Sequence, residues 1–181
     1  KEDPEAVILN VHSDQVIKSE DKFCQAAVEA IKVAAETDNI VTIAIQPTFA
    51  HTGLGYIRIG NQLEGTKAFK ALGFKEKPDL STAQAFLASG QYLWNSGMYS
   101  WSVKNLFASF AQHAPELKQA VDQAMEVMGT GQEQQVIDKI YEQAENLAID
   151  VAVYEINTNL VVVAGDFDWS DVGDWKVMYD T

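Results

Sequence analysis

Aspartates are crowded near the end of the sequence, where GDFDWSDVGDW at residues 165–175 contains four of them beside two tryptophans. This segment follows the apolar run NLVVVAGDF at 159–167, which predicts a buried strand. Asp14 follows another apolar run, AVILNV at 6–11, in the same manner. Carboxylates brought together from two strand ends suit Mg²⁺, because this ion binds few carboxylates and leaves positions for phosphate oxygens and water. The pattern therefore predicts a cation site.

Both carboxylate motifs also have an ordinary structural interpretation. Asp14 could cap the turn after its strand, since aspartate side chains commonly accept hydrogen bonds from the backbone of a turn. A run of aspartates is usually a solvated surface loop. The residue types alone leave these alternatives open.

Three further motifs contain residue types that bind sugars and phosphates. The two glycines of TGLGY at 52–56 let backbone N–H groups approach a ligand closely. EKP at 76–78 offers a carboxylate for sugar hydroxyls and a lysine for a phosphate. In WNSGMY at 94–99, the Asn95 amide can both donate to a hydroxyl and accept from it. The alternatives are a turn, a solvated strand end, and an asparagine that stabilises its own turn.

The elements predicted around these motifs alternate between strand and helix. Apolar residues with the spacing of one helical face predict a helix over 21–36, between strands at 6–11 and 40–45. This order is typical of a parallel α/β unit, in which ligands bind beyond the carboxyl ends of the strands. We predict further strands in 51–60, before Pro78 and at 159–167, and a turn into another strand at 94–101. Further helices are predicted at 82–89, 104–112, 116–128 and 132–146.

Several single residues have a predicted place within these elements. Ser81 is the predicted N-cap of the helix at 82–89, and Gly90 is its predicted end. Cys24 lies in an apolar helical pattern and is expected to be a buried small hydrophobe. Trp94 and Trp101 are expected in the core rather than as a platform for a ligand.

Composition restricts the class of protein. The 181 residues, 47% of them hydrophobic, suffice for a core, and we expect a single domain over residues 1–181. The net charge of −13 and the single arginine argue against a nucleic acid partner, because phosphate-backbone binding needs clustered cations. One cysteine excludes an internal disulfide, and no apolar run is as long as a membrane span. We therefore expect a cytoplasmic protein with no membrane partner.

The order of the motifs is more specific than any one of them. Together they resemble the bacterial mannose-1-phosphate guanylyltransferase family of sugar nucleotidyltransferases, from about residue 4 to the end of the chain. The resemblance implies a three-layer α/β/α, Rossmann-like mixed sheet of the nucleotidyltransferase type, N-terminally truncated. The motifs are SDQVI, TGLGYI, FKEKPDLSTAQAFLASGQYLWNSGMYSW, HAPEL, AIDVAVYE and FDWSDVGDW.

The resemblance also implies an activity. Members of the family join mannose 1-phosphate to GTP, which gives GDP-mannose and pyrophosphate, with the help of Mg²⁺. By the positions of the motifs, Asp14 and Asp171 resemble the two aspartates that bind the metal. The remaining aspartates of the last motif are then expected to shape or solvate its loop.

The other site residues implied by the resemblance contact the sugar phosphate. Glu76 and Asn95 resemble the residues that bind the mannose hydroxyls. Lys77 resembles the lysine beside the sugar phosphate, and Gly55 the residue whose backbone contacts the sugar. Asp150 matches an aspartate near the sugar pocket.

The chain departs from the family at its beginning. The resemblance implies a first strand and a glycine-rich loop with an arginine and a lysine that bind the nucleotide, and KEDPEAVILN offers no counterpart. We therefore expect GTP or GDP-mannose to bind only if another segment supplies that loop. The chain could be a fragment of a longer enzyme, a natural noncatalytic homologue, or one half of a complex, for example a homodimer paired at a sheet edge.

Gln15 is a second departure, because the family usually has histidine after the metal-binding aspartate. Glutamine can form hydrogen bonds but cannot carry a charge. Two alternative functions also stay open. The chain could be a noncatalytic module that binds a sugar phosphate or dimerises, or an enzyme for another hexose 1-phosphate such as glucose 1-phosphate.

Overall fold

The computed structural model describes residues 3, 5–144, 146, 148–149, 153 and 159–172. The chain divides into two compact units, the first spanning Lys1–Asn105 with Thr158–Thr181 and the second Leu106–Asn157. The expectation of a single domain over the whole chain stays a prediction. None of the helices in the described part combines the length and apolar character that crossing a membrane requires.

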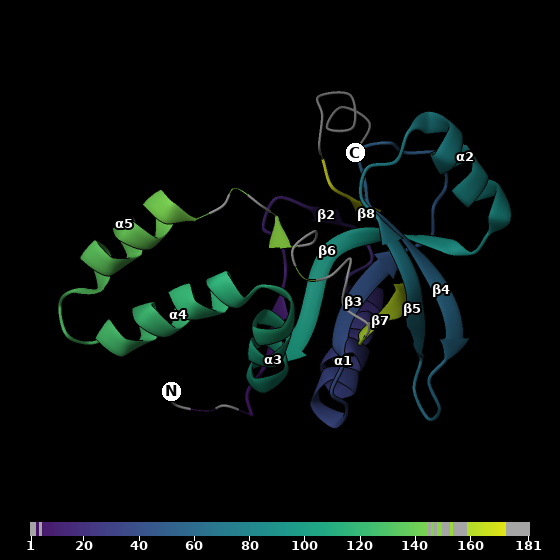
Figure 1. The fold of residues 1–181 in the computed structure, drawn as a ribbon. Helices are drawn as coiled ribbons and strands as arrows, with labels where there is room; N and C mark the ends of the chain where they lie inside the picture. Colours follow the sequence, from purple (N-terminus) through teal and green to yellow (C-terminus); the bar gives the residue numbers. More distant parts are fainter. Residues whose placement is uncertain are drawn as a thin grey trace. The chain divides into compact units, whose positions relative to one another are not determined.

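A six-stranded mixed sheet forms the centre of the first unit (Figure 1). Its strand order is β1-β6-β3-β7-β5-β4, in which β3 and β7 are parallel and the other neighbours are antiparallel. This arrangement confirms the mixed α/β fold expected from the sequence. The strands are β1 (Val7–Asn10), β3 (Ile40–Ile45), β4 (Tyr56–Gln62), β5 (Ala68–Lys75), β6 (Tyr92–Ser102) and β7 (Leu160–Gly165).

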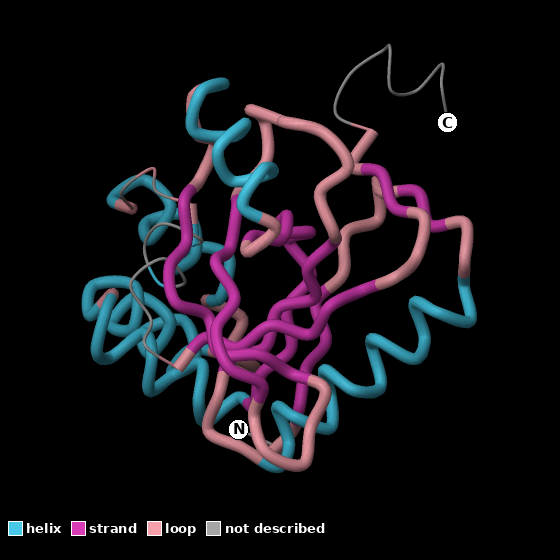
Figure 2. Tube along the Cα trace, turned by 90° about the vertical axis from the view of Figure 1, so that its right-hand side faces the viewer, coloured by secondary structure: helices cyan, strands magenta, loops and turns pink. Residues whose placement is uncertain are grey.

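The sheet curls because β6 is long enough to pair with different strands before and after a bulge in its path. Its eleven residues pair with β1, with β3 and, through Tyr92–Trp94, with β4. The last strand in the order therefore joins back to the second. Figure 2 shows the strands crossing one another rather than lying flat. A separate two-stranded ladder, which the sequence did not predict, joins β2 (Val16–Ile17) and β8 (Trp169–Ser170).

Helix α1 (Glu20–Glu36) packs against the sheet through small residues. Its buried side chains are mainly alanines, which let the helix lie close to the strands. Strand β3 is buried along its whole length, as expected for a strand covered on both faces. Odd-numbered residues such as Ile43 join the core under α1, and Ala44 joins a second cluster on the other face. The remaining helices are α2 (Leu80–Ser89), α3 (Val103–His113), α4 (Pro115–Val127) and α5 (Glu133–Gln143).

Two expectations about burial were wrong. Strand β1 is not buried: exposure alternates along it, and Ile8 is 43% exposed, because β1 pairs only with β6 among the described strands. The predicted strand–helix–strand unit also did not include β6, which lies between β1 and β3.

Cys24, which was expected to be buried, is exposed. It lies on the outer face of α1 with Val28 and Ile31, although the pattern there is apolar.

One helix boundary and one predicted turn differ from the predictions. The N-cap of α2 is Asp79 rather than Ser81, since the Asp79 carboxylate accepts from the Thr82 N–H at 2.7 Å. The predicted end at Gly90 is confirmed by its left-handed conformation, with φ of 65°. WNSGMY is not a turn between strands but part of the continuous strand β6. Trp94 and Trp101 are buried, as expected.

Replacing Asp79 with alanine should lower the melting temperature by about 2–4 °C, because α2 loses its cap. The Thr82 backbone N–H, with smaller contributions from the Ser81 and Thr82 side chains, lowers the pKa of Asp79. A lowered pKa means that the ionised form stabilises the fold, so the effect should be full at neutral pH and vanish as the pH falls through the folded-state pKa. Thermal melts across the acid range measure this, and Ser81→Ala is the control with a smaller expected shift.

Candidate functional site

The β2–β8 ladder brings the two candidate metal ligands together. The strands are antiparallel, with Val16 opposite Ser170. Asp14 lies just before β2 and Asp171 directly after β8, and the start of one antiparallel strand lies beside the end of the other. Both aspartates are therefore at the same end of the ladder, with Asp14 exposed and Asp171 half-buried.

The neighbouring aspartates are engaged elsewhere. Asp166 forms an ion pair with Lys22 at 3.0 Å. Asp168 accepts a hydrogen bond from the Ser19 hydroxyl at 3.3 Å, and its carbonyl accepts from the backbone N–H of Lys18 at 3.0 Å. These contacts tie the segment before β8 to the start of α1. They agree with a role for both aspartates in shaping this loop.

Three predicted sugar-binding residues lie in a row across β5, β4 and β6. The backbone N–H of Asn95 donates to the Gly55 carbonyl at 2.8 Å. A Cβ atom at Gly55 would lie 2.5 Å from Glu76 Oε2 and 3.4 Å from the Cβ of Asn95. Gly55 is thus the point where the other two meet, and a side chain would fit there only if Glu76 and the Phe74 ring shifted.

Lys77 is held beside this row by an unusual backbone conformation. Its φ of 41° is in the left-handed region, which residues other than glycine and asparagine rarely adopt. In a regular strand Glu76 and Lys77 would point to opposite faces. Here the Lys77 ammonium lies 3.4 Å from Glu76 Oε1, so a carboxylate and an ammonium lie on the same side of the chain.

A bulge in β6 follows Asn95 and inserts two residues, because Ile43 pairs with Met98 while Ala44 pairs with Asn95. Asn95 Oδ1 accepts from the Gly97 N–H and from the Thr42 hydroxyl, both at 3.2 Å. The Ser96 hydroxyl donates to the Ile43 carbonyl at 2.5 Å. The Asn95 oxygen therefore stabilises its own bulge, and a contact of Asn95 with a sugar hydroxyl stays a prediction.

The β2–β8 ladder is attached to β6 at the same bulge. Gln15 Nε2 donates to the Ser96 carbonyl at 2.8 Å, and Gln15 Oε1 accepts from the Trp169 indole N–H at 2.9 Å. His12 Nε2 lies 3.1 Å from the Gly97 carbonyl. Sequence reasoning did not find these contacts, because the partners of Gln15 are 81 and 154 residues away.

The carboxylates at the end of the ladder fit a magnesium ion by their chemistry. Mg²⁺ is usually bound through one or two carboxylates, with water and phosphate oxygens in its other positions. The described residues contain no group of three or more His, Cys, Asp and Glu that could enclose an ion. Asp150 and Asp174 lie outside the described residues.

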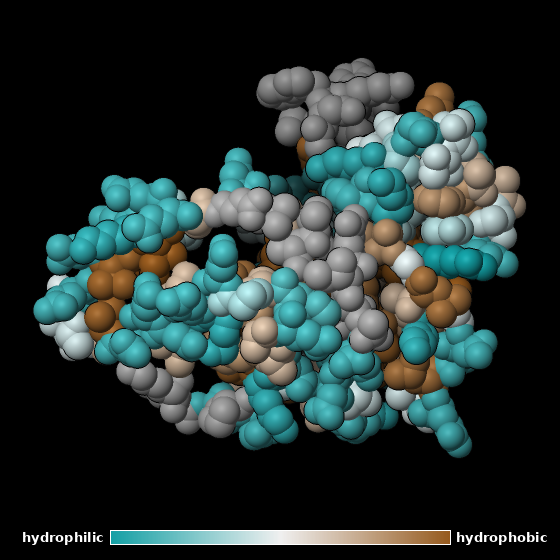
Figure 3. Space-filling model, viewed as in Figure 1, coloured by the Kyte–Doolittle hydropathy of each residue, from teal (hydrophilic) through white to brown (hydrophobic). Residues whose placement is uncertain are grey.

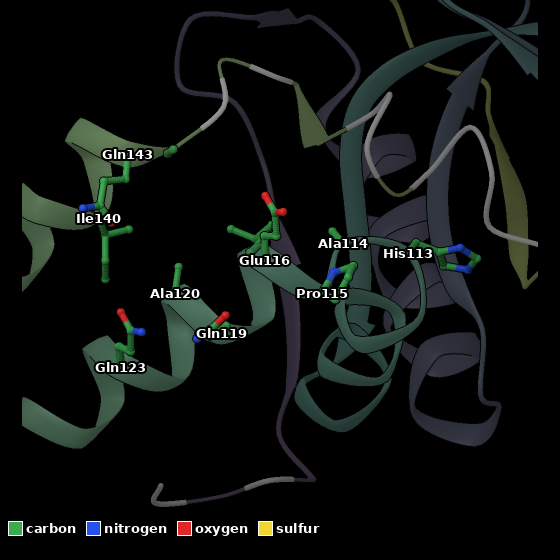
Figure 4. A pocket seen from close by; sticks show the side chains of 11 residues that line it. His113, Ala114, Pro115, Glu116, Gln119, Ala120, Gln123, Ile140 and Gln143 are labelled. Carbon is green, nitrogen blue, oxygen red and sulfur yellow. The ribbon is translucent and has the colours of Figure 1, made fainter.

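The second unit contains a hollow of about 610 Å³ between α4 and α5. Figure 4 shows the side chains that line it, including Pro115, Gln123 and Ile140. Figure 3 shows apolar surface between the two helices. Among the described residues, none that the sequence predicted to bind a sugar, phosphate or metal lines this hollow.

The chain matches the nucleotidyl transferase family over residues 1–181. It is 39% identical over 175 residues to the xanthan biosynthesis protein XanB of Xanthomonas campestris pv. campestris strain B100, covering 96% of this chain and 37% of that protein. It is 35% identical over 178 residues to the mannose-1-phosphate guanylyltransferase of Escherichia coli strain K12, covering 96% and 37%. The chain thus spans a little more than a third of the length of these relatives.

Solved structures share the fold. The protein described as mannose-1-phosphate geranyltransferase from Thermus thermophilus has a TM-score of 0.85 and 25% identity, covering 94% of this chain and 48% of that one. The protein described as mannose-6-phosphate isomerase from Helicobacter pylori has a TM-score of 0.78 and 24% identity, covering 93% and 65%. At that identity the second likeness concerns the fold alone.

Gly55→Ala should destabilise the fold by about 1–3 kcal/mol, because the added methyl group overlaps Glu76 and the ring of Phe74. Gly73→Ala in β5 is the matched control, since a Cβ there meets nothing within 4 Å. Urea unfolding of the three proteins measures the difference. Equal stability of the Gly55 and Gly73 variants would contradict the close approach of Glu76.

Proposed function

The chain belongs to the nucleotidyl transferase family, and we propose that it forms the part of a mannose-1-phosphate guanylyltransferase that holds the sugar phosphate and the metal. The proposed reaction joins mannose 1-phosphate to GTP and gives GDP-mannose and pyrophosphate. One observation carries this proposal. The same bulge in β6 connects both groups of residues. Asn95, which meets Gly55 and Glu76, stands at the bulge, and the ladder that ends at Asp14 and Asp171 is attached to it.

The row across β5, β4 and β6 is the proposed sugar subsite. The Glu76 carboxylate is only partly buried and can accept hydrogen bonds from sugar hydroxyls. Because Gly55 has no side chain, the Glu76 carboxylate can lie directly beside the backbone there. Asn95 borders the same place from β6 through its Cβ atom.

The phosphate of the sugar is proposed to lie between Lys77 and the metal. The Lys77 side chain is 65% exposed, so its ammonium can act as a point charge toward a phosphate. Asp14 and Asp171 would hold the magnesium ion. When bound, this ion supplies positive charge to the phosphate oxygens and orients them.

The transfer itself requires neither a base nor a nucleophile from the protein. An oxygen of the sugar phosphate, already anionic, forms a bond to the α-phosphorus of GTP while the α–β phosphoanhydride bond breaks and pyrophosphate leaves. The residues named above would align the sugar phosphate and offset its charge. Asp150 is proposed to border the sugar. We assign no described residue to GTP.

The noncatalytic module considered from the sequence is not favoured. Relatives that match nearly the whole chain are named as guanylyltransferases. Titrations with mannose 1-phosphate and with GTP would distinguish the two functions. A binding module would bind mannose 1-phosphate, but it would not bind GTP even when a segment with the nucleotide-binding loop is supplied.

Glu76→Ala should weaken mannose 1-phosphate binding about 10- to 100-fold, because a charged hydrogen-bond acceptor for the hydroxyls is lost. Calorimetric titration in the presence of Mg²⁺ measures the dissociation constant. Binding of inorganic phosphate should change little, and Glu64→Ala, at an exposed glutamate away from the row, is the matched control. An equal loss for phosphate and sugar phosphate would argue against a role in hydroxyl binding.

Asp171→Asn should abolish the Mg²⁺-dependent part of mannose 1-phosphate binding, because the amide removes one of the two anionic ligands. The same titration with and without Mg²⁺ measures this part. Asp166→Asn is the control, since this aspartate lies five residues earlier and pairs with Lys22. Unchanged Mg²⁺ dependence in Asp171→Asn would remove this residue as a metal ligand.

A further inference from the structure

We propose that Gln15 is a positioning residue, whose side-chain amide fixes the metal-binding carboxylates relative to the sugar subsite. The inference rests on the proposed function for what the two parts of the site bind. It concerns the attachment between them, which depends on contacts of the described residues alone.

The amide of Gln15 uses both of its polar atoms in this attachment. Its Nε2 donates to the Ser96 carbonyl at 2.8 Å, and its Oε1 accepts from the Trp169 indole N–H at 2.9 Å. A flipped amide would direct its NH₂ group at the indole N–H and its oxygen at a carbonyl, so only one orientation satisfies both partners. Gln15 is half-buried, which shields these bonds from water.

Each residue in this contact lies within two residues of a proposed site residue in the sequence. Gln15 directly follows Asp14, and Ser96 directly follows Asn95. Trp169 stands two residues before Asp171. One amide therefore connects the backbone segments that carry both carboxylates and the amide of the sugar subsite.

The ladder is short, so side-chain hydrogen bonds can contribute to holding it in place. Strands β2 and β8 share two residue pairs, and Ile17 and Trp169 pack against the hydrophobic core. One more backbone hydrogen bond, from the Lys18 N–H to the Asp168 carbonyl, extends the ladder at the end opposite to Asp14 and Asp171. At the end that carries Asp14 and Asp171, Gln15 and the exposed His12 form hydrogen-bond contacts with carbonyls of β6.

The test uses substitutions that remove the hydrogen bonds of Gln15. Gln15→Met retains the length of the side chain without either bond, and Trp169→Phe removes the indole donor together with part of the ring that packs against the core. Gln91→Met is the matched control, because the Gln91 amide accepts one surface hydrogen bond, from Arg58, at 3.3 Å. Binding of Mn²⁺, as a spectroscopic substitute for Mg²⁺, is measured by electron paramagnetic resonance with mannose 1-phosphate present.

Gln15→Met should weaken Mn²⁺ binding about tenfold, the effect of losing two hydrogen bonds that orient the ligands. Trp169→Phe should weaken it less, and the double variant should be no weaker than Gln15→Met, since the indole acts through Gln15. The control should match the wild-type chain. A lower melting temperature with unchanged Mn²⁺ affinity would show a purely structural role and overturn the proposal.

Amide hydrogen exchange of the metal-free chain separates this inference from the proposed function. Gln15→Met should accelerate exchange at the amides of β2, β8 and Lys18, and leave those of β3 and β7 unchanged. Unchanged exchange in the ladder would overturn the attachment. If the wild-type chain binds no Mn²⁺, the proposed function fails, and faster exchange in the variant would still support the role of Gln15 in holding the ladder.

Discussion

The bulge in β6 is the constraint on which the candidate site depends. Two extra residues in a central strand would leave buried polar groups without ladder partners, and such groups are costly when unpaired. The side chains of Asn95, Ser96 and Thr42 satisfy the interior of the bulge. The carbonyls of Ser96 and Gly97 are met by Gln15 and His12. A local irregularity in one strand thus places the Asn95 amide and anchors the separate ladder that carries the aspartates.

The curl of the sheet places the proposed sugar subsite, because it brings the end of β5 toward β6. Because β6 pairs with β3 and also with β4, the end of β5 lies only one strand away from Asn95. Gly55 permits this approach, since any side chain there would overlap Glu76. The left-handed backbone at Lys77 places an ammonium on the same side of the chain as the Glu76 carboxylate. Strain of this kind persists only where the surrounding structure holds it, and it is frequent at binding sites.

Charge gives the proposed function its main physical requirement. A chain with a net charge of −13 repels a phosphorylated substrate unless local cations offset that field. Near the proposed phosphate position the described residues offer the exposed ammonium of Lys77, together with a pair of carboxylates that suits a divalent cation. Anionic residues can thus serve an anionic substrate when a metal stands between them. This chain spans a little more than a third of the length of its relatives, so the reaction with GTP is a proposal.

The sequence by itself predicted most of the helices and strands and named the candidate residues, because both depend on local patterns, but it did not predict the β2–β8 ladder. Helical spacing predicted α1, Gly90 marked the end of α2, and the order of motifs identified the family. The sequence did not distinguish Asp79 from Ser81 as the N-cap of α2, since both residue types cap helices well. It also did not show that Cys24 is exposed, because α1 is apolar around most of its circumference. Only the tertiary structure placed β6 between β1 and β3 and joined Gln15 to Ser96 and Trp169. These partners lie far apart in the chain, and no local pattern encodes which distant backbone carbonyl a side chain will meet.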